Sequence, residues 1–500
     1  MDAVAVCNPK SLRAVPLLPR YANLGAPYHN RVSPTPLPQT QLVHFNAQLA
    51  TELGVDADND ELLDILSGNQ SWPAYSPLAS VYAGHQFGSW VSQLGDGRAL
   101  TIAELRRPDG QRAELQLKGA GPTPYSRGSD GRAVLRSSIR EYLCSEAMHA
   151  LGIPTTRCLS LMSSSLPVQR EIAETAAVVC RVAPSFLRFG HFEFFYHCGQ
   201  HERLAPLADH VIGEHFPHLT DQPDRYTRWL EATIERTAQL IAQWQTVGFC
   251  HGVMNTDNFS ILGLTLDYGP FGFMDAFHQH HVCNHSDYEG RYSYGSQPSV
   301  SEWNCSRLLQ ATLPLVSTNK EEAVDIIATI VKRYAPTYYQ AVARRWANKL
   351  GLRELRDGDT ALVGRLLTIL HRSKSDFTRS FRLLSRVRSD TDAPATGIRE
   401  EIVDMAAFDA WIIEYRQRLR AEANTDDAAR AARMQHVNPK YVLRNHLAQA
   451  AIARASEGDY SEVDILMRLL SRPYDEQPAM EHYAAAPPAE MRQLEISCSS

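Results

Sequence analysis

The sequence lacks the features that mark membrane proteins, disulfide-stabilised proteins and P-loop NTPases. In its 500 residues no apolar run reaches the roughly 18–20 residues that a membrane helix needs, so we expect no membrane partner. The nine cysteines are scattered and none are spaced as CxxC, which argues against a zinc ribbon or a disulfide framework. No GxxxxGK[ST] segment is present, so a P-loop NTPase is not expected.

An excess of basic charge is also absent. Lys and Arg total 50 against 56 Asp and Glu, which gives a formal net charge of −6. Because nucleic-acid-binding domains are usually strongly basic, we expect no nucleic-acid partner. The first residues, MDAVAVCNPKSLRAVPLLPRY, have an early Asp and prolines but not the apolar core of a secretory signal. With the odd number of cysteines this favours a reducing compartment, and we expect a cytoplasmic protein.

The chain does contain a strand-rich first part and a helical second part. Apolar patterning predicts strands over 99–105, 114–118 and 177–182. Apolar residues at every fourth position predict a helix from Leu135, with Asp130 upstream as the expected N-cap. A stronger pattern predicts a helix over 226–247 that ends at Gly248 and places its aromatic residues in the core.

Beyond residue 300 the pattern is helical, with predicted breaks near 351–360, 390–398 and 424–438. The charged segment 415–433 is interpreted as a solvated helix face, residues 1–45 as an extended lead-in, and the last 25 or so residues as irregular. We infer an α+β fold with two lobes. Its predicted parts are an N-terminal extension (1–80), a small strand-rich lobe (81–200), a helical lobe (201–390) and a C-terminal extension (391–500). Nothing in the sequence demands a dimer, and we expect a monomer.

Five features that suit a nucleotide site follow one another along the chain. They are the glycine turn Gly95-Asp96-Gly97-Arg98, Lys118 at a strand end, Glu141 within the next helix, a polar loop with His251 and Asn258, and Asp267-Tyr268-Gly269. Glycine N–H groups can approach phosphates closely, and a lysine held by a helix carboxylate supplies positive charge. Asn and Asp oxygens suit Mg²⁺ or Mn²⁺. This order is typical of protein kinases, and we predict a protein-kinase-like fold.

The loop that should carry the kinase base departs from the kinase pattern. A kinase has an aspartate two residues after the histidine, but here that position is Val253, which cannot accept a proton. A carboxylate stands instead at Asp257, directly before Asn258. This relocation argues against ordinary γ-phosphoryl transfer. We expect His251 to be structural, with hydrogen bonds to the backbone.

A histidine-rich run spans residues 278–285, where a kinase would have its activation segment. Its spacing fits no standard zinc motif, and we do not expect a zinc site there.

Long segments of the chain resemble selenoprotein O and its bacterial relatives, the YdiU-type protein adenylyltransferases. The matching segments are YAGHQFG (82–88), LGDGR (94–98), LQLKGAGPTPYSRGSDGRAVLRSSIREYL (115–143), HGVMNTDNFSILGLTLDYGPFGFMD (251–275), CNHSDYEGRYSYGSQP (283–298) and NPKYVLRNHLAQ (438–449). The resemblance implies a kinase-like fold that binds ATP in a reversed orientation. It implies transfer of AMP to Ser, Thr or Tyr hydroxyls of proteins, with release of pyrophosphate. Some bacterial relatives use UTP with Mn²⁺, so UMP transfer stays open.

The resemblance also implies roles for single residues. The nucleotide would contact Gly95, Gly97, Arg98, Lys118, Asp130, Gly131, Arg181, Arg188 and Asp267. Asn258 and Asp267 would bind the metal, Asp257 would accept the proton, and Glu141 would pair with Lys118. Negative charge develops on the leaving pyrophosphate, where Arg181 and Arg188 would supply bidentate donors.

Two other interpretations remain open. One is a conventional kinase, and the other is a nucleotide-binding scaffold that responds to redox state. Eukaryotic relatives carry a Cys-x-x-Sec pair near the C-terminus, whereas this chain ends Cys498-Ser499-Ser500. Cys498 could still pair with Cys283 and gate the site on oxidation, or the two thiols are unrelated.

Overall fold

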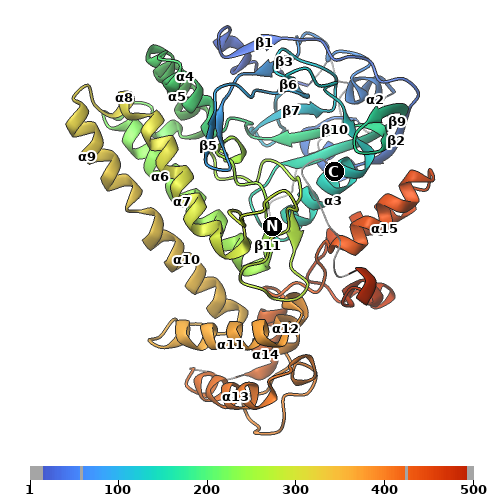
Figure 1. The fold of residues 1–500 in the computed structure, drawn as a ribbon, viewed down its shortest axis with the longest axis vertical. Helices are drawn as coiled ribbons and strands as arrows, with labels where there is room; N and C mark the ends of the chain where they lie inside the picture. The colour runs from blue at the N-terminus through green and yellow to red at the C-terminus, as the bar shows by residue number, and fades with distance from the viewer. Residues whose placement is uncertain (1–14, 57–59, 423–425, 492–500) are drawn as a thin grey trace.

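The structure is a computed structural model that describes residues 15–56, 60–422 and 426–491. Within these residues most strands lie before residue 185, and helices dominate the rest of the chain (Figure 1). The predicted α+β class is confirmed.

The described part of the chain forms an antiparallel sheet of eight strands. Its order is β1 (His29–Arg31), β3 (Leu78–Ser80), β6 (Ala99–Arg106), β7 (Arg112–Lys118), β10 (Ala173–Ala183), β9 (Arg157–Gln169) and β2 (Thr40–Phe45), and β8 (Ala133–Val134) pairs with β10. The three strands predicted from patterning are confirmed as parts of β6, β7 and β10. The interpretation of residues 1–45 as only a lead-in is wrong, because β1 pairs with β3 and β2 pairs with β9.

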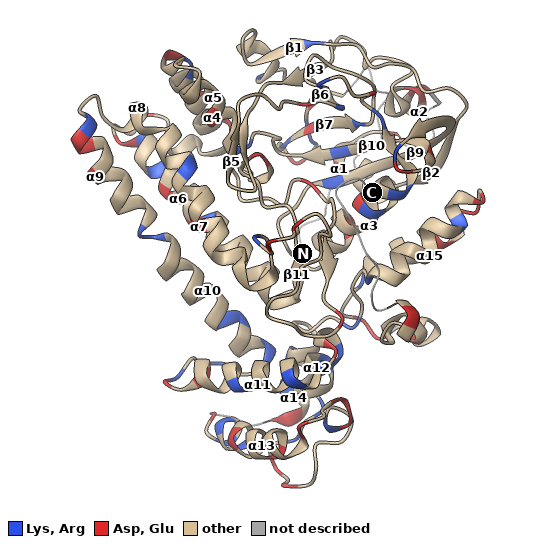
Figure 2. Cartoon of the chain, in the orientation of Figure 1, with Lys and Arg blue, Asp and Glu red and all other residues tan. Residues whose placement is uncertain are grey.

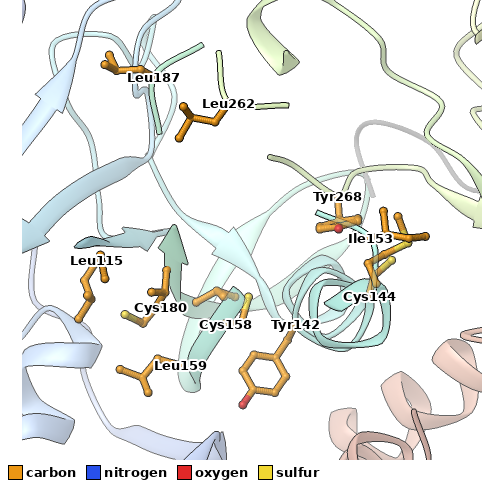
Figure 3. Packing of buried hydrophobic residues seen from close by; sticks show 14 of the residues in the cluster. Leu115, Tyr142, Cys144, Ile153, Cys158, Leu159, Cys180, Leu187, Leu262 and Tyr268 are labelled. Atoms are coloured by element: carbon orange, nitrogen blue, oxygen red, sulfur yellow. The ribbon is translucent and has the colours of Figure 1, made fainter. Parts of the chain in front are cut away.

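Three helices accompany the sheet, namely α1 (Ala47–Leu53), α2 (Asp60–Ser67) and α3 (Leu135–Ala150). Helix α3 packs on β9 and β10. The buried side chains of Leu115, Leu159 and Cys180 come from three neighbouring strands and lie close together in the core (Figure 3). The predicted N-cap at Asp130 is wrong: Val134 is the N-cap of α3, because residues 133–134 first pair with β10 as β8.

The helical part begins with α4 (Phe189–His197), α5 (Leu204–His215) and α6 (Arg225–Val247). The prediction for α6 is confirmed: Gly248 is its left-handed C-cap with φ +79°, and Trp229 and Trp244 are buried. The described residues also include two pairs of short antiparallel strands outside the main sheet. These are β4 (Gly84–Gln86) with β5 (Ser89–Val91), and β11 (Phe249–Cys250) with β12 (Gly272–Phe273).

The remaining helices are α7 (Gln297–Ala311), α8 (Leu313–Val316), α9 (Lys320–Val331), α10 (Tyr334–Lys349), α11 (Asp359–Ser373), α12 (Phe377–Leu384), α13 (Met405–Arg420), α14 (Asp427–Gln435), α15 (Asn445–Ser456) and α16 (Ser461–Leu470). Helices α15 and α16 pack on α3. A second apolar cluster joins α10 to α14 around Trp346, Phe377 and Trp411.

One expectation for the C-terminal region is wrong and another holds only in part. Helix α14 occupies much of the break predicted at 424–438. The segment 415–433 is solvated at residues such as Gln417, Arg420 and Arg433, but Arg416 and Arg430 are buried. Arg416 donates to the carbonyl oxygens of Arg388 and Ala393, which explains why charged residues lie inside.

In the described ranges we find no helix that combines the length and apolar character of a membrane span. Acidic and basic residues are mixed on the outer helices, as on α13 (Figure 2).

Candidate active site

A cavity of about 600 Å³ contains most of the predicted site residues. Those that line it are Gly95, Gly97, Arg98, Lys118, Asp130, Arg181, Arg188, Asp257, Asn258 and Asp267. Glu141 lies behind Lys118, and Gly131 shapes a lining loop without facing the cavity.

Positive charge dominates the cavity wall. Among the described residues, seven basic and four acidic side chains line it. The basic ones are Arg98, Lys118, Arg127, Arg132, Arg170, Arg181 and Arg188. A wall of this charge favours a polyanionic ligand such as a nucleoside triphosphate.

The sheet and α3 bring three charged side chains of the site together. In the β7–β10 register Lys118 faces Val179 and Gln116 faces Arg181, so Lys118 and Arg181 project from the same side of the sheet. Glu141 approaches from α3, and its Oε2 lies 2.5 Å from Lys118 Nζ. Its other oxygen lies 3.4 Å from Arg181 Nη1.

Asp267 is the centre of an ion-pair network. Its Oδ1 pairs with Arg181 and lies 3.3 Å from Lys118 Nζ, and its Oδ2 lies 3.2 Å from Arg188 Nη1. Burial alone would raise the pKa of Asp267, but Arg181, Lys118 and Arg188 together hold that pKa well below its usual range. The carboxylate is therefore ionised at neutral pH.

The glycine turn before β6 is required by close packing. Gly95 has φ +75°, and a Cβ there would collide with the Tyr125 ring. A Cβ on Gly97 would lie 2.9 Å from the carbonyl oxygen of Tyr125. These glycines let the loop over 122–131 close on the turn, while the Arg98 side chain is exposed at the cavity.

Asp257 and Asn258 lie on a 3₁₀ turn, Thr256–Asn258. Asp257 is 8% exposed, and its Oδ1 has no hydrogen-bond partner among the described residues. Burial raises the pKa of Asp257 to about 7, against the lowering effect of Arg188. The side-chain Nδ2 of Asn258 donates to the carbonyl oxygen of Val253 at 2.8 Å, which leaves its Oδ1 as the atom available to a ligand.

His251 is buried beside this turn. Its Nδ1 accepts a hydrogen bond from the Val253 backbone N–H at 3.3 Å, and its ring stacks on Trp244 with centroids 5.1 Å apart. Burial lowers the pKa of His251 to about 4, so the ring is neutral. These contacts are those of a structural residue, as the sequence predicted.

Asp130 lies in the loop before β8, where Arg170 pairs with its carboxylate at 2.8 Å. The hydrogen bond from Arg170 lowers the pKa of Asp130. Gly131 has φ +66°, and a Cβ there would collide with the Gly121 backbone, so this glycine sets the course of the loop.

Sequence reasoning gave no role to several residues that line the cavity, and four of them bear on its charge. Arg127, Arg132 and Arg170 add positive charge, and the ring of Tyr82 lies 4.7 Å from the Arg188 guanidinium. The signal for Arg127 and Arg132 was their place in or beside the Gly-, Pro- and Ser-rich loop that precedes the helix. Tyr82 lies in the segment YAGHQFG (82–88), one of those that carry the family resemblance, but no role was assigned to it. No sequence signal marks Arg170, because only tertiary packing brings it to the cavity.

The residues fit a divalent cation. Asn258, whose Oδ1 is not used in the hydrogen bond to Val253, and the Asp267 carboxylate both line the cavity, and hard oxygen ligands of this kind suit Mg²⁺ or Mn²⁺. Two protein ligands leave the other octahedral positions to phosphate oxygens and water.

Cys283 is buried next to the loop over 251–258, and its Sγ donates to the Cys250 carbonyl oxygen at 3.3 Å. Cys498 lies outside the described residues, so the Cys283–Cys498 pairing stays a prediction.

Known proteins match the chain along nearly all of its length. The model of the family described as protein adenylyltransferase SelO matches residues 12–471. A protein of Methylococcus capsulatus named protein nucleotidyltransferase YdiU is 64% identical over 497 residues, 99% of each chain. A protein of the same name from Burkholderia multivorans is 53% identical over 506 residues, 97% of this chain and 96% of its own.

Proposed function

The chain belongs to the SelO family of protein adenylyltransferases, and from that premise we propose that it transfers AMP from ATP to Ser, Thr or Tyr hydroxyl groups of proteins. The observation that carries the proposal is the position of Asp257. Its carboxylate is buried and lies on the wall of a cavity rich in cations, and within the described part of the chain its Oδ1 has no hydrogen-bond partner.

The chemical step is a displacement at the α-phosphorus. The acceptor hydroxyl oxygen attacks this phosphorus, the bond to the oxygen that bridges the α- and β-phosphates breaks, and pyrophosphate leaves. Asp257 takes the hydroxyl proton, a step typically worth ~10²–10⁴-fold in rate. The pKa of about 7 suits a general base near neutral pH.

The cations stabilise the charge that develops on the leaving pyrophosphate. Lys118, Arg181 and Arg188 now converge on Asp267, and phosphate oxygens would take over part of these contacts. In this orientation the triphosphate tail points toward the arginines and the α-phosphorus toward Asp257. Arg98 and Arg127 are exposed cations at the same cavity that would contact the remaining nucleotide oxygens.

Asn258 and Asp267 would hold the divalent cation. When bound, this ion neutralises phosphate charge and polarises the reacting phosphoryl group. The chain's contribution is to present the Asn258 Oδ1, which the hydrogen bond to Val253 fixes in orientation.

We further propose a kinase-like arrangement of the fold, with the sheet and α3 as the small lobe and α4 to α12 as the large lobe. The Lys118–Glu141 ion pair and the loop over 251–258 support this arrangement. Ordinary kinase chemistry is disfavoured because Val253, which also lines the cavity, stands at the position of the kinase base.

The test uses ATP labelled with ³²P at the α- or the γ-phosphate, a divalent cation, and a heat-treated cell extract as acceptor protein. We expect protein-bound label from α-labelled ATP only, an equal release of pyrophosphate, and loss of both with EDTA. Parallel reactions with UTP and Mn²⁺ ask which nucleotide is preferred, since the relatives' name specifies nucleotidyl transfer without the base.

The same reactions decide between the alternatives. Label from the γ-phosphate would identify a kinase, and ATP binding without any label transfer would identify a scaffold. Either result would overturn the proposal.

A further inference from the structure

A cluster of two histidines and one glutamate lies outside the cavity described above. The side chains of His85, Glu193 and His197 place one nitrogen or oxygen atom each within 4.8 Å of one another, and they are the one such group found among the described residues. His85 is on β4, and Glu193 and His197 are on α4. Because these two are four residues apart, they share one face of the helix.

We propose that His85, Glu193 and His197 form a binding site for a divalent transition-metal ion of the Zn²⁺ type, separate from the nucleotide-associated cation. Two imidazoles and one carboxylate, with water in the fourth position, are a common ligand set for Zn²⁺. The hard ions Mg²⁺ and Ca²⁺ prefer oxygen ligands and do not suit this set.

Glu193 supplies the observation that points to a cation. Its side chain is fully buried, and its Oε2 has no hydrogen-bond partner among the described residues. Among the described residues Glu193 has one ion-pair partner, His85, whose Nδ1 lies 2.6 Å from Glu193 Oε1. A buried carboxylate with half of its acceptor capacity unused is costly unless a positive charge is supplied.

The geometry needs only small movements to bind an ion. At zinc–nitrogen distances of about 2.0–2.1 Å, tetrahedral ligand atoms are about 3.3 Å apart. The His85–Glu193 contact would open by less than 1 Å as the Nδ1 proton is released. His197 would move inward, which its exposed position allows.

Aromatic rings lie beside both imidazoles. Trp90 lies on His197 with centroids 4.1 Å apart, and Trp303 meets His85 edge-on at 5.3 Å. Burial lowers the pKa of His197, as do the charges of His85 and Arg307, while Glu193 raises it. Arg307 is the nearby cation that opposes metal binding, and Glu193 is the charge that offsets it.

The site would hold the β4–β5 hairpin against the catalytic loop. The backbone N–H of His85 donates to Thr256 Oγ1 at 2.7 Å, and the backbone N–H of Phe87 donates to Asn255 Oδ1 at 3.2 Å. An ion that ties His85 to α4 would therefore stabilise the segment that contacts the turn with Asp257.

The experiment uses full-length protein from which transition metals have been removed. Excess Mg²⁺ is then added to occupy sites made of oxygen ligands. Calorimetric titration with Zn²⁺ and visible absorption on titration with Co²⁺ measure binding, and melting curves with and without Zn²⁺ measure stabilisation. We expect one Zn²⁺ per chain, Co²⁺ bands of a nitrogen- and oxygen-ligated ion, and a higher melting temperature.

His197→Gln should abolish the Zn²⁺-induced rise in melting temperature and weaken Zn²⁺ binding by more than about 10–100-fold. Changes to residues that only hydrogen-bond to a metal ligand already cause a loss of that size. The matched control is His201→Gln, an exposed histidine four residues along that stacks on Tyr196 and lies outside the cluster.

Absence of stoichiometric Zn²⁺ binding would mean that His85 and Glu193 form only a hydrogen-bonded pair. Equal binding by the His197→Gln and His201→Gln proteins would place the ion elsewhere. Both results would overturn the proposal.

Discussion

Arg188 holds Asp257 through the backbone and not through the carboxylate. Its Nη1 donates to the main-chain carbonyl oxygen of Asp257 at 3.0 Å, while the Asp257 Oδ1 remains unpaired among the described residues. The arginine therefore fixes the 3₁₀ turn and leaves the acid free to accept a proton. This separation of positioning from chemistry leads to the first prediction.

Asp257→Asn should lower the rate of AMP transfer by ~10²–10⁴-fold, because the amide has the same shape but cannot take the proton. ATP affinity should stay within a few-fold of the parent protein. Incorporation of label from α-labelled ATP and calorimetric ATP binding measure the two effects. Asp221→Asn, at an exposed position that does not line the cavity, is the control. Transfer at the parent rate by Asp257→Asn would remove Asp257 from its role.

Gly84→Ala should slow transfer by about 10²-fold, the effect of a misplacement of about 1 Å. A Cβ at Gly84 would lie 2.9 Å from both Asp257 Oδ1 and Thr256 Oγ1, so the turn must shift. ATP binding should change little. The control is Gly364→Ala in α11, where an added Cβ meets no atom within 4 Å. Equal turnover by the two alanine variants would contradict the prediction.

Lys118→Met should raise the Kd for ATP by about 10–100-fold, equivalent to ~1.4–2.8 kcal/mol of lost phosphate contact. It should also lower stability by about 1–3 kcal/mol, because Glu141 is 2% exposed and its remaining ion-pair partner among the described residues is Arg181, at 3.4 Å.

The double variant Lys118→Met/Glu141→Leu separates these two effects. It should recover most of the lost stability in urea titrations but not ATP affinity, since the buried Glu141 carboxylate is removed and Asp267, which loses Lys118, keeps Arg181 and Arg188. Recovered ATP binding in the double variant would show that Lys118 acts only through Glu141.

Lys349→Met should stabilise the protein more at pH 6 than at pH 9. Lys349 is 4% exposed, and burial, with Arg345, lowers its pKa to about 7. In the unfolded chain its pKa is about 10.4. The unfolded chain therefore binds this proton more tightly than the folded protein, which destabilises the fold. The destabilisation is complete below pH 7 and decreases as pH rises toward about 10.4.

At pH 6 the free energy of unfolding of Lys349→Met should exceed that of the parent protein by about 2–4 kcal/mol. The lost contact of the Lys349 ammonium with the Phe381 ring reduces this difference. Thermal melts across pH 6–9 measure it, with exposed Lys332→Met as the control, which should show no trend with pH. A pH-independent difference between the Lys349→Met and parent proteins would refute this explanation.

Sequence patterning identified strands β6 and β7 and helices α3 and α6 from the recurrence of their apolar residues, although the structure buries nearly all of β6, β7 and α3. The chain order of Lys118, Glu141, Asn258 and Asp267 indicated a nucleotide site. Strand β2 was missed because its central residues are largely exposed and its pairing with β9 joins segments over 110 residues apart. Local pattern carries no information on such distant pairing.

The same limit applied to polar residues. Arg416 and Arg430 were expected in solvent because charged residues are usually exposed, but backbone carbonyl oxygens satisfy them inside the fold. The cluster of His85, Glu193 and His197 was missed because His85 is over 100 residues from its partners. Only the packing of the β4–β5 hairpin on α4 brings them together.

Strand β2 also matters for solubility. It covers the outer edge of β9, a strand of 13 residues, at the end of the sheet. A shortened protein that begins after residue 45 would expose that row of backbone donors and acceptors, a ready template for pairing with other chains. Expression of the fold without its first strands should therefore give aggregates, even though every residue that lines the nucleotide cavity would still be present.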